Sequence, residues 1–153
     1  MKFFRILLLF PVLLLSSCGD KYYVEEVMMN TKTISRTVYS NNWIKVDNFP
    51  GWDGVEDSGN TFFYYDLRIP ELSDFVFNKG VMNAYLETYD GQVTVLTPLP
   101  FDNYYRYNYE WAGWTEQVTC EFSLQNVRFI LKYNDFDVDR PPLDYTFMVR
   151  LAW

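Results

Sequence analysis

From residue 31 to the end of the chain, apolar and polar residues alternate with a period of two. Successive side chains of a strand point to opposite faces of its sheet, so such alternation predicts strands with one face on a core. The clearest example is the C-terminal segment 145–153. The residues that we expect to face the core there are Tyr145, Phe147, Val149, Leu151 and Trp153.

Seven further segments show the same alternation, rich in aromatic and β-branched residues and bounded by Asn, Asp, Gly and Pro. We expect strands at 32–39, 61–69, 81–89, 92–97, 103–110, 114–123 and 126–133. Residues 22–29 are either a first strand or part of a tether. Asp90-Gly91 predicts a two-residue hairpin turn. Pro70 and residues 71–79 break the alternation, which indicates a helical turn or a compact loop.

These elements define the expected fold class. About eight strands with turn signals every 8–12 residues are typical of an all-β protein. We expect an antiparallel two-sheet β-sandwich over residues 31–153, with a jelly-roll-like strand order as one option.

The first 18 residues differ from the rest of the chain. Lys2 and Arg5 precede an apolar stretch over residues 6–15, which is too short to span a membrane and is typical of a secretory signal. Leu15-Ser16-Ser17-Cys18 follows it and matches the lipobox of bacterial lipoproteins. We therefore expect residues 1–17 to be a lipoprotein signal peptide and Cys18 to carry lipid. An ordinary cleavage site or a buried helix is the alternative.

A lipidated Cys18 sets where the domain works. Residues 18–30 then form the lipidated N-terminus and a tether of at most about 40 Å. Several acyl chains hold a protein stably on a membrane. The expected location is the bacterial cell envelope, at the outer membrane, with the membrane as a partner through Cys18. Cys120 has no disulfide partner in that case, and its strand spacing predicts a small buried residue.

Composition and charge exclude several functions. The chain has no histidine, so Ser-His-Asp and Cys-His catalysis and His-based zinc sites are excluded within this chain. Its formal net charge is -7, and loss of Lys2 and Arg5 with the leader makes the charge -9. Nucleic acid is therefore not an expected partner.

Several segments together resemble a group of small uncharacterised Bacteroidota lipoproteins with a C-terminal β-sandwich domain. Besides the lipobox, they are Ile69–Leu72, Asn78–Val81, Thr97–Pro100, Phe129–Tyr133 and Pro141–Pro142 with Tyr145–Arg150. Members of that group often carry a collagen-like insert after the lipidated cysteine, which is absent here. The resemblance implies a β-sandwich at the periplasmic or outer surface, and it implies no reaction.

Two acidic groups are candidates for chemistry. Asp135, Asp137 and Asp139 alternate in one loop and are weak candidates for a Ca²⁺ site, although a solvated loop is the favoured interpretation. Residues 53–57 bring three carboxylates close to Trp52. Paired carboxylates beside an aromatic ring are typical of glycosidases, but no apolar pocket is evident that would raise one pKa.

Aromatic residues make up 20% of the chain. A row of alternate aromatics over residues 105–111 is favoured as part of the core. Trp side chains in loops are better candidates for a surface that binds glycan or protein, because indoles give large, stiff contact areas. These candidates are Trp43, Trp52, Trp111 and Trp114.

The sequence thus predicts a lipid-anchored, extracytoplasmic β-sandwich that acts as a structural or binding module of the bacterial envelope. We expect neither enzymatic activity nor a cofactor, and a glycan or an envelope protein as the ligand. A carbohydrate-binding module that uses the loop aromatics is the first alternative. A carboxylate-based hydrolase is the second.

Overall fold

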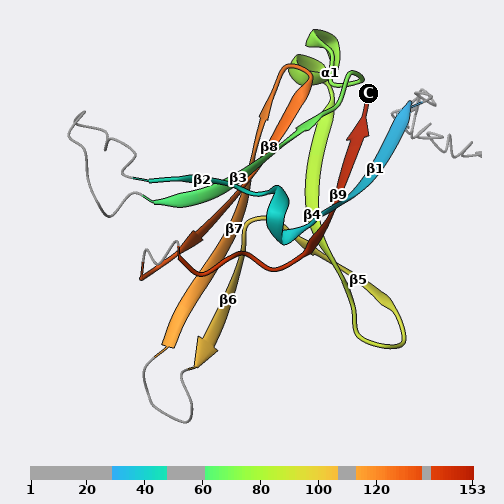
Figure 1. Cartoon of the computed structure of the whole chain (residues 1–153). Coiled ribbons are helices and arrows are strands. Elements are labelled where there is room, and N and C mark those ends of the chain that lie inside the picture. Colours follow the sequence, from blue (N-terminus) through green and yellow to red (C-terminus); the bar gives the residue numbers. More distant parts are fainter. Residues whose placement is uncertain (1–28, 48–60, 107–112, 136–138) are drawn as a thin grey trace, which may run out of the picture.

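The computed structural model describes residues 29–47, 61–106, 113–135 and 139–153. Two antiparallel sheets of four and five strands pack against each other (Figure 1), which confirms the all-β sandwich. The four-stranded sheet has the order β1 (Thr31–Val38), β9 (Tyr145–Ala152), β4 (Val81–Tyr89) and β5 (Thr94–Pro98).

The five-stranded sheet has the order β2 (Ile44–Val46), β3 (Phe62–Arg68), β8 (Asn126–Tyr133), β7 (Gly113–Ser123) and β6 (Phe101–Arg106). Eight of the nine described strands, including the C-terminal one, lie close to segments predicted from the sequence. β2 was not predicted, because three residues are too few to show a period. β1 lies beside β9 and β3 beside β8, so early and late strands are neighbours in both sheets, whereas β6, β7 and β8 form a simple meander.

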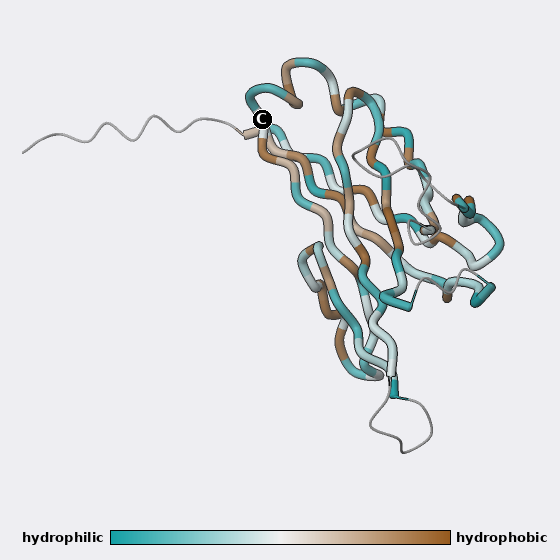
Figure 2. Tube along the Cα trace, turned by 90° about the vertical axis from the view of Figure 1, so that its left-hand side faces the viewer, coloured by the Kyte–Doolittle hydropathy of each residue, from teal (hydrophilic) through white to brown (hydrophobic). Residues whose placement is uncertain are grey.

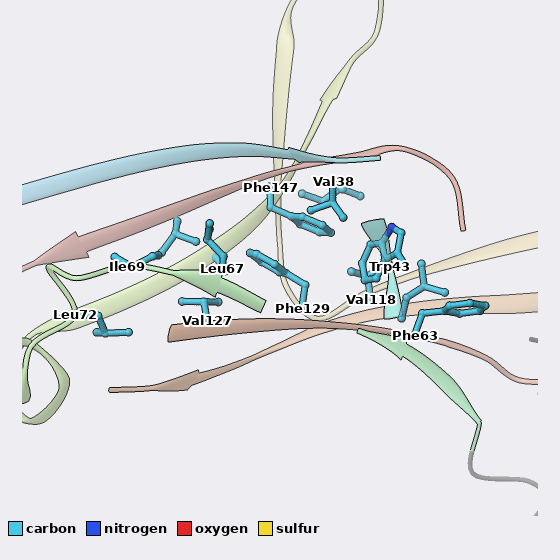
Figure 3. Packing of buried hydrophobic residues seen from close by; sticks show 14 of the residues in the cluster. Val38, Trp43, Phe63, Leu67, Ile69, Leu72, Val118, Val127, Phe129 and Phe147 are labelled. Atoms are coloured by element: carbon cyan, nitrogen blue, oxygen red, sulfur yellow. The ribbon is translucent and has the colours of Figure 1, made fainter. Parts of the chain in front are cut away.

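The predicted core face of the C-terminal strand is confirmed, and the strand before it in the chain shows the same alternation. Val127, Phe129, Leu131 and Tyr133 of β8 are all buried, and so are Phe147, Val149 and Leu151 of β9. Along the strands, hydrophobic and hydrophilic residues alternate in Figure 2. Phe129 and Phe147 stack between the sheets with their centroids 4.0 Å apart (Figure 3). Aromatic stacking of this kind adds to the free energy gained from burying the rings.

The segment that breaks the alternation crosses one end of the sandwich, and it includes the predicted helical turn. It contains the helix α1 (Asp74–Lys79), which begins after Ser73, whose hydroxyl accepts a hydrogen bond from the Val76 amide. A Ser at this position satisfies one of the free amides of a first helical turn. The β7–β8 turn joins this end, because the Gln125 amide donates to the Leu72 carbonyl.

The chain also enters the sandwich at this end. The Asn30 amide donates to the Trp153 carbonyl, and the Trp153 amide donates back to Asn30. Figure 1 shows α1, the β7–β8 turn and the C-terminus together at the top of the molecule. We call this part the Asn30 end. The opposite end carries the β4–β5 loop.

The β4–β5 turn differs from its prediction. A hairpin is present, but four residues, 90–93, connect the strands instead of two. The Asp90 carboxylate accepts hydrogen bonds from the Gln92 and Val93 amides, and Gly91 has a φ of 96°. A side-chain carboxylate that accepts local amides extends the turn, and this is a common role of Asp in loops.

Candidate functional site

Trp43 is not a surface residue, which corrects its assignment to an exposed binding surface. It follows a short 3-10 turn, η1 (Ser40–Asn42), and its side chain is 8% exposed within the core. Its ring contacts the rings of Tyr145 and Phe147 edge to face at centroid distances of 6.3 and 6.1 Å. The indole N–H is buried and has no hydrogen-bond partner within the described part of the chain.

Trp114 is half-buried, and other side chains of the protein already contact its ring. Tyr105, its neighbour across β6 and β7, stacks on it at a centroid distance of 4.2 Å. The Arg140 guanidinium lies 3.9 Å from the ring, and Tyr133 meets it edge to face. A ligand would have to displace one of these contacts to stack on this indole.

The other two candidates, Trp52 and Trp111, lie outside the described residues, as do residues 53–57.

Beside Trp114, the structure places a buried carboxyl group that the sequence analysis did not single out. Glu116 on β7 is 1% exposed and faces the core opposite Tyr133. The Tyr145 hydroxyl of β9 donates a hydrogen bond to Glu116 Oε1. Because β7 and β9 belong to different sheets, this hydrogen bond links the two layers of the sandwich.

Burial controls the ionisation of this pair. Removal from water raises the pKa of Glu116, while the hydrogen bond from Tyr145 and the positive charge of Arg140 act in the opposite direction. Burial also raises the pKa of Tyr145, and the hydrogen bond to Glu116 raises it further. General acids in enzymes also have a pKa that burial raises, so Glu116 shares this one property with them. Neither surface hollow described below reaches it.

The acidic loop holds its described carboxylates in contact with cations of the protein. Arg140 Nη2 lies 3.1 Å from Asp135 Oδ2, and Lys45 Nζ lies 3.4 Å from Asp139 Oδ1. No group of three or more metal-ligating side chains occurs among residues that the structure describes. Asp137 lies outside them, so the weak calcium candidate formed by Asp135, Asp137 and Asp139 is not tested as a whole.

The thiol of Cys120 is half-buried on the core side of β7 and packs against buried residues. Burial, and secondarily the charge of Glu121, raises its pKa to about 11. A thiol with so high a pKa is almost entirely protonated at neutral pH and is a poor nucleophile. This agrees with the interpretation of Cys120 as a small packing residue. The other cysteine, Cys18, lies outside the described residues.

Two shallow hollows lie on the outer faces of the sheets. One, of about 270 Å³, lies on the five-stranded sheet and is lined by six residues: Asp102, Thr115, Gln117, Lys132, Tyr133 and Asn134. The other, of about 350 Å³, lies on the four-stranded sheet at the Asn30 end. We call it the Arg150 hollow. Its lining consists of Thr31, Thr33, Val81, Asn83, Arg150, Leu151 and Ala152.

The Arg150 hollow is the better candidate for a binding site, because its polar side chains come from three adjacent strands. Arg150 of β9 pairs with Thr33 of β1 on one side and with Asn83 of β4 on the other. All three are exposed. The sequence analysis missed this site. The polar face of 145–153 was visible, but the pairing of β9 with both β1 and β4 depends on long-range topology.

The chain matches no known family model, no curated protein and no solved structure. No described helix combines the length and the apolar character of a membrane span.

Proposed function

We propose that this chain is a lipid-anchored module of the bacterial cell envelope, fastened to the outer membrane through Cys18. The β-sandwich serves as its structural or binding domain. The observation that carries the proposal is the order of the first 18 residues: a basic start, an apolar stretch, and Leu15-Ser16-Ser17-Cys18. The resemblance to small Bacteroidota lipoproteins supports the same location.

The way the chain enters the sandwich supports this proposal. Asn30 pairs with Trp153 at one end of the strands, only 12 positions after Cys18. A tether of that length reaches at most about 40 Å. It would hold the domain next to the bilayer, with the Asn30 end nearest the lipid.

The anchor is tested by replacing the cysteine. We expect Cys18→Ser to abolish incorporation of labelled palmitate and to leave the precursor unprocessed, because the sulfur is the acceptor of lipid. Cys120→Ser is the matched control, since it removes the other thiol and should keep both labelling and processing. Labelling is read by autoradiography of the purified protein, and processing by its intact mass.

Two outcomes would contradict the proposed lipid anchor. If the Cys18→Ser protein still takes up palmitate, or if native protein begins at Met1, the lipoprotein assignment fails. Protease treatment of intact cells then separates two positions of an anchored domain. Digestion of the sandwich indicates the outer surface, where extracellular ligands are accessible, and protection indicates a periplasmic partner.

A further inference from the structure

We propose that the Arg150 hollow binds an anionic oxygen group, a phosphate or a carboxylate, of a ligand. The inference goes beyond the proposed anchor and does not depend on it, because all residues that line the hollow belong to the β-sandwich and none belongs to the lipidated N-terminus. Three observations carry it: the donors that converge on the hollow, the missing counter-charge of Arg150, and the place of the hollow in the fold.

Three hydrogen-bond donors lie in one row across the sheet. Arg150 has Thr33 and Asn83 as its direct partners on the neighbouring strands. Adjacent strands are about 4.8 Å apart, so the guanidinium, the hydroxyl and the amide fall within the reach of one small anion. Thr31 adds a second hydroxyl one pair further along. A guanidinium matches the geometry of a carboxylate or phosphate because it donates two parallel hydrogen bonds.

Arg150 has no salt bridge within the described ranges, and its side chain contacts the ring of Tyr85 at 5.5 Å. Two other arginines do have a carboxylate partner: Arg128 is paired with Asp66, and Arg140 with Asp135.

No acid lies next to Arg150 on the part of the outer face that the structure describes. Among the described outward-facing residues of β1, β9 and β4, Glu87 is the one acid, and it is two cross-strand pairs away from Arg150. Its carboxylate accepts a hydrogen bond from the Ser35 hydroxyl. The charge in the hollow is therefore available to an anion from solution.

The position of the hollow admits two sources for that anion. Thr31 lines it and directly follows Asn30, where the chain enters the sandwich. A lipid headgroup would present a phosphate at this end if the domain is anchored. A free phosphate or a carboxylate on a soluble ligand has the same chemistry. Val81 and Ala152, which also line the hollow, would contact the uncharged part of either ligand.

The test uses the protein as purified from cells, in a maltoside detergent, which contains no phosphate. Inorganic phosphate, and separately acetate, is titrated against chloride at equal ionic strength, and the side-chain Nε–H resonance of Arg150 is followed by NMR. We expect a saturable shift at Arg150 with at least one of the two anions. Arg150→Gln should weaken the binding at least about tenfold, as read at the amides of Asn83 and Thr33.

Arg68→Gln is the matched control. Arg68 is exposed at the end of β3, has no salt bridge among described residues and lies outside the hollow, so its loss changes the net charge equally. It should leave the binding unchanged. The backbone spectra of both variants report whether each is folded, and Arg150→Lys is the second variant if the Gln variant is not.

A second arm identifies the source of the anion. The same chain is placed in phosphatidylcholine bicelles, with and without phosphatidylglycerol. A shifted Arg150 resonance before any phosphate is added indicates a headgroup, and a shift only after addition indicates a soluble ligand. The proposal is overturned if neither anion gives a saturable shift and bicelles give none. Equal shifts at Arg68, or unchanged affinity in Arg150→Gln, overturn it too. None of these results bears on palmitate labelling of Cys18.

Discussion

Glu116 is a carboxylic acid among apolar side chains, and its presence there has an energetic cost. A buried carboxyl group loses its hydration, and one hydrogen bond from Tyr145 replaces only part of it. The neutral form avoids the larger part of this cost, which is why the pKa of Glu116 rises. A raised pKa means that the folded chain holds this proton more tightly than the unfolded chain does.

The raised pKa of Glu116 makes the free energy of unfolding depend on pH. The contribution of Glu116 to the free energy of unfolding is greatest at low pH and falls as the pH rises above the ordinary value of 4.5. We expect Glu116→Gln to remove this fall, because a Gln side chain stays neutral and still accepts the hydrogen bond from Tyr145. Urea unfolding from pH 4 to 7 measures it. The difference between variant and wild type should shift in favour of the variant with increasing pH.

Glu121→Gln is the control for Glu116, since Glu121 is on the same strand but exposed. Its unfolding curves should follow those of the wild type across the pH range. Parallel pH profiles for Glu116→Gln and the wild type would show that the carboxyl of Glu116 titrates alike in the folded and unfolded chains. That result would contradict the raised pKa.

At the residue scale, the alternation along β7 includes Glu116 among its core-facing positions. Val118, Cys120 and Phe122 alternate with polar residues along β7, and two positions before Val118 the same period reaches Glu116. The position was therefore predictable, but the burial was not, because carboxylates are seldom buried unless they have a partner. That partner, Tyr145, is 29 positions away in the other sheet.

At the scale of elements, the junction between α1 and β4 at the Asn30 end is a close backbone contact. A Cβ atom on Gly80 would lie 2.6 Å from the Val76 carbonyl oxygen and 2.8 Å from that of Ala152. Both are backbone atoms, so neither can rotate away. Gly80 therefore lets the helix, β4 and the end of β9 meet in one place.

We expect Gly80→Ala to destabilise the domain by about 1–3 kcal/mol, because the backbone around it must move apart. Lys79→Ala, one residue earlier on the exposed side of the helix, is the control and should change stability by less than about 0.5 kcal/mol. Chemical denaturation with both variants measures the effect. A Gly80→Ala protein as stable as the control would show that this junction yields without cost.

Element prediction succeeded where a strand was long and failed where structure was short. Strands of six to eleven residues contain enough alternation to define a face, as in β8 and β9. η1 and β2 have three residues each, and they carry Trp43 into the core although the sequence placed it in a loop. A Trp beside such short elements cannot be assigned to core or surface from period alone.

At the scale of the whole molecule, different structural elements lie at the two ends of the sandwich. The Asn30 end holds α1 and the β7–β8 turn, and the other end holds the β4–β5 loop (Figure 1). The Arg150 hollow also lies at the Asn30 end. Nine residues of β4 run between the ends, a length of about 30 Å. An anchor at Cys18 would thus keep the two ends at different average distances from a bilayer.

This difference in distance can be measured with single labels. Leu124 in the β7–β8 turn and Val93 in the β4–β5 loop are both exposed, at 55% and 56%. We expect a fluorophore on Leu124→Cys to transfer energy to a headgroup acceptor in vesicles more efficiently than one on Val93→Cys. Cys120 should label little, because burial raises the pKa of its thiol to about 11.

The comparison of the two labels tests orientation apart from anchoring. Both proteins carry the same lipid on Cys18 if the proposal holds, so unequal transfer cannot come from unequal membrane binding. A tether of up to about 40 Å reduces the contrast without reversing it, because it joins the sandwich at the Asn30 end. Equal transfer from both positions would mean that the domain tumbles freely on its tether. Stronger transfer from Val93→Cys would mean that the β4–β5 loop faces the lipid, and the Arg150 hollow would then be turned away from the headgroups.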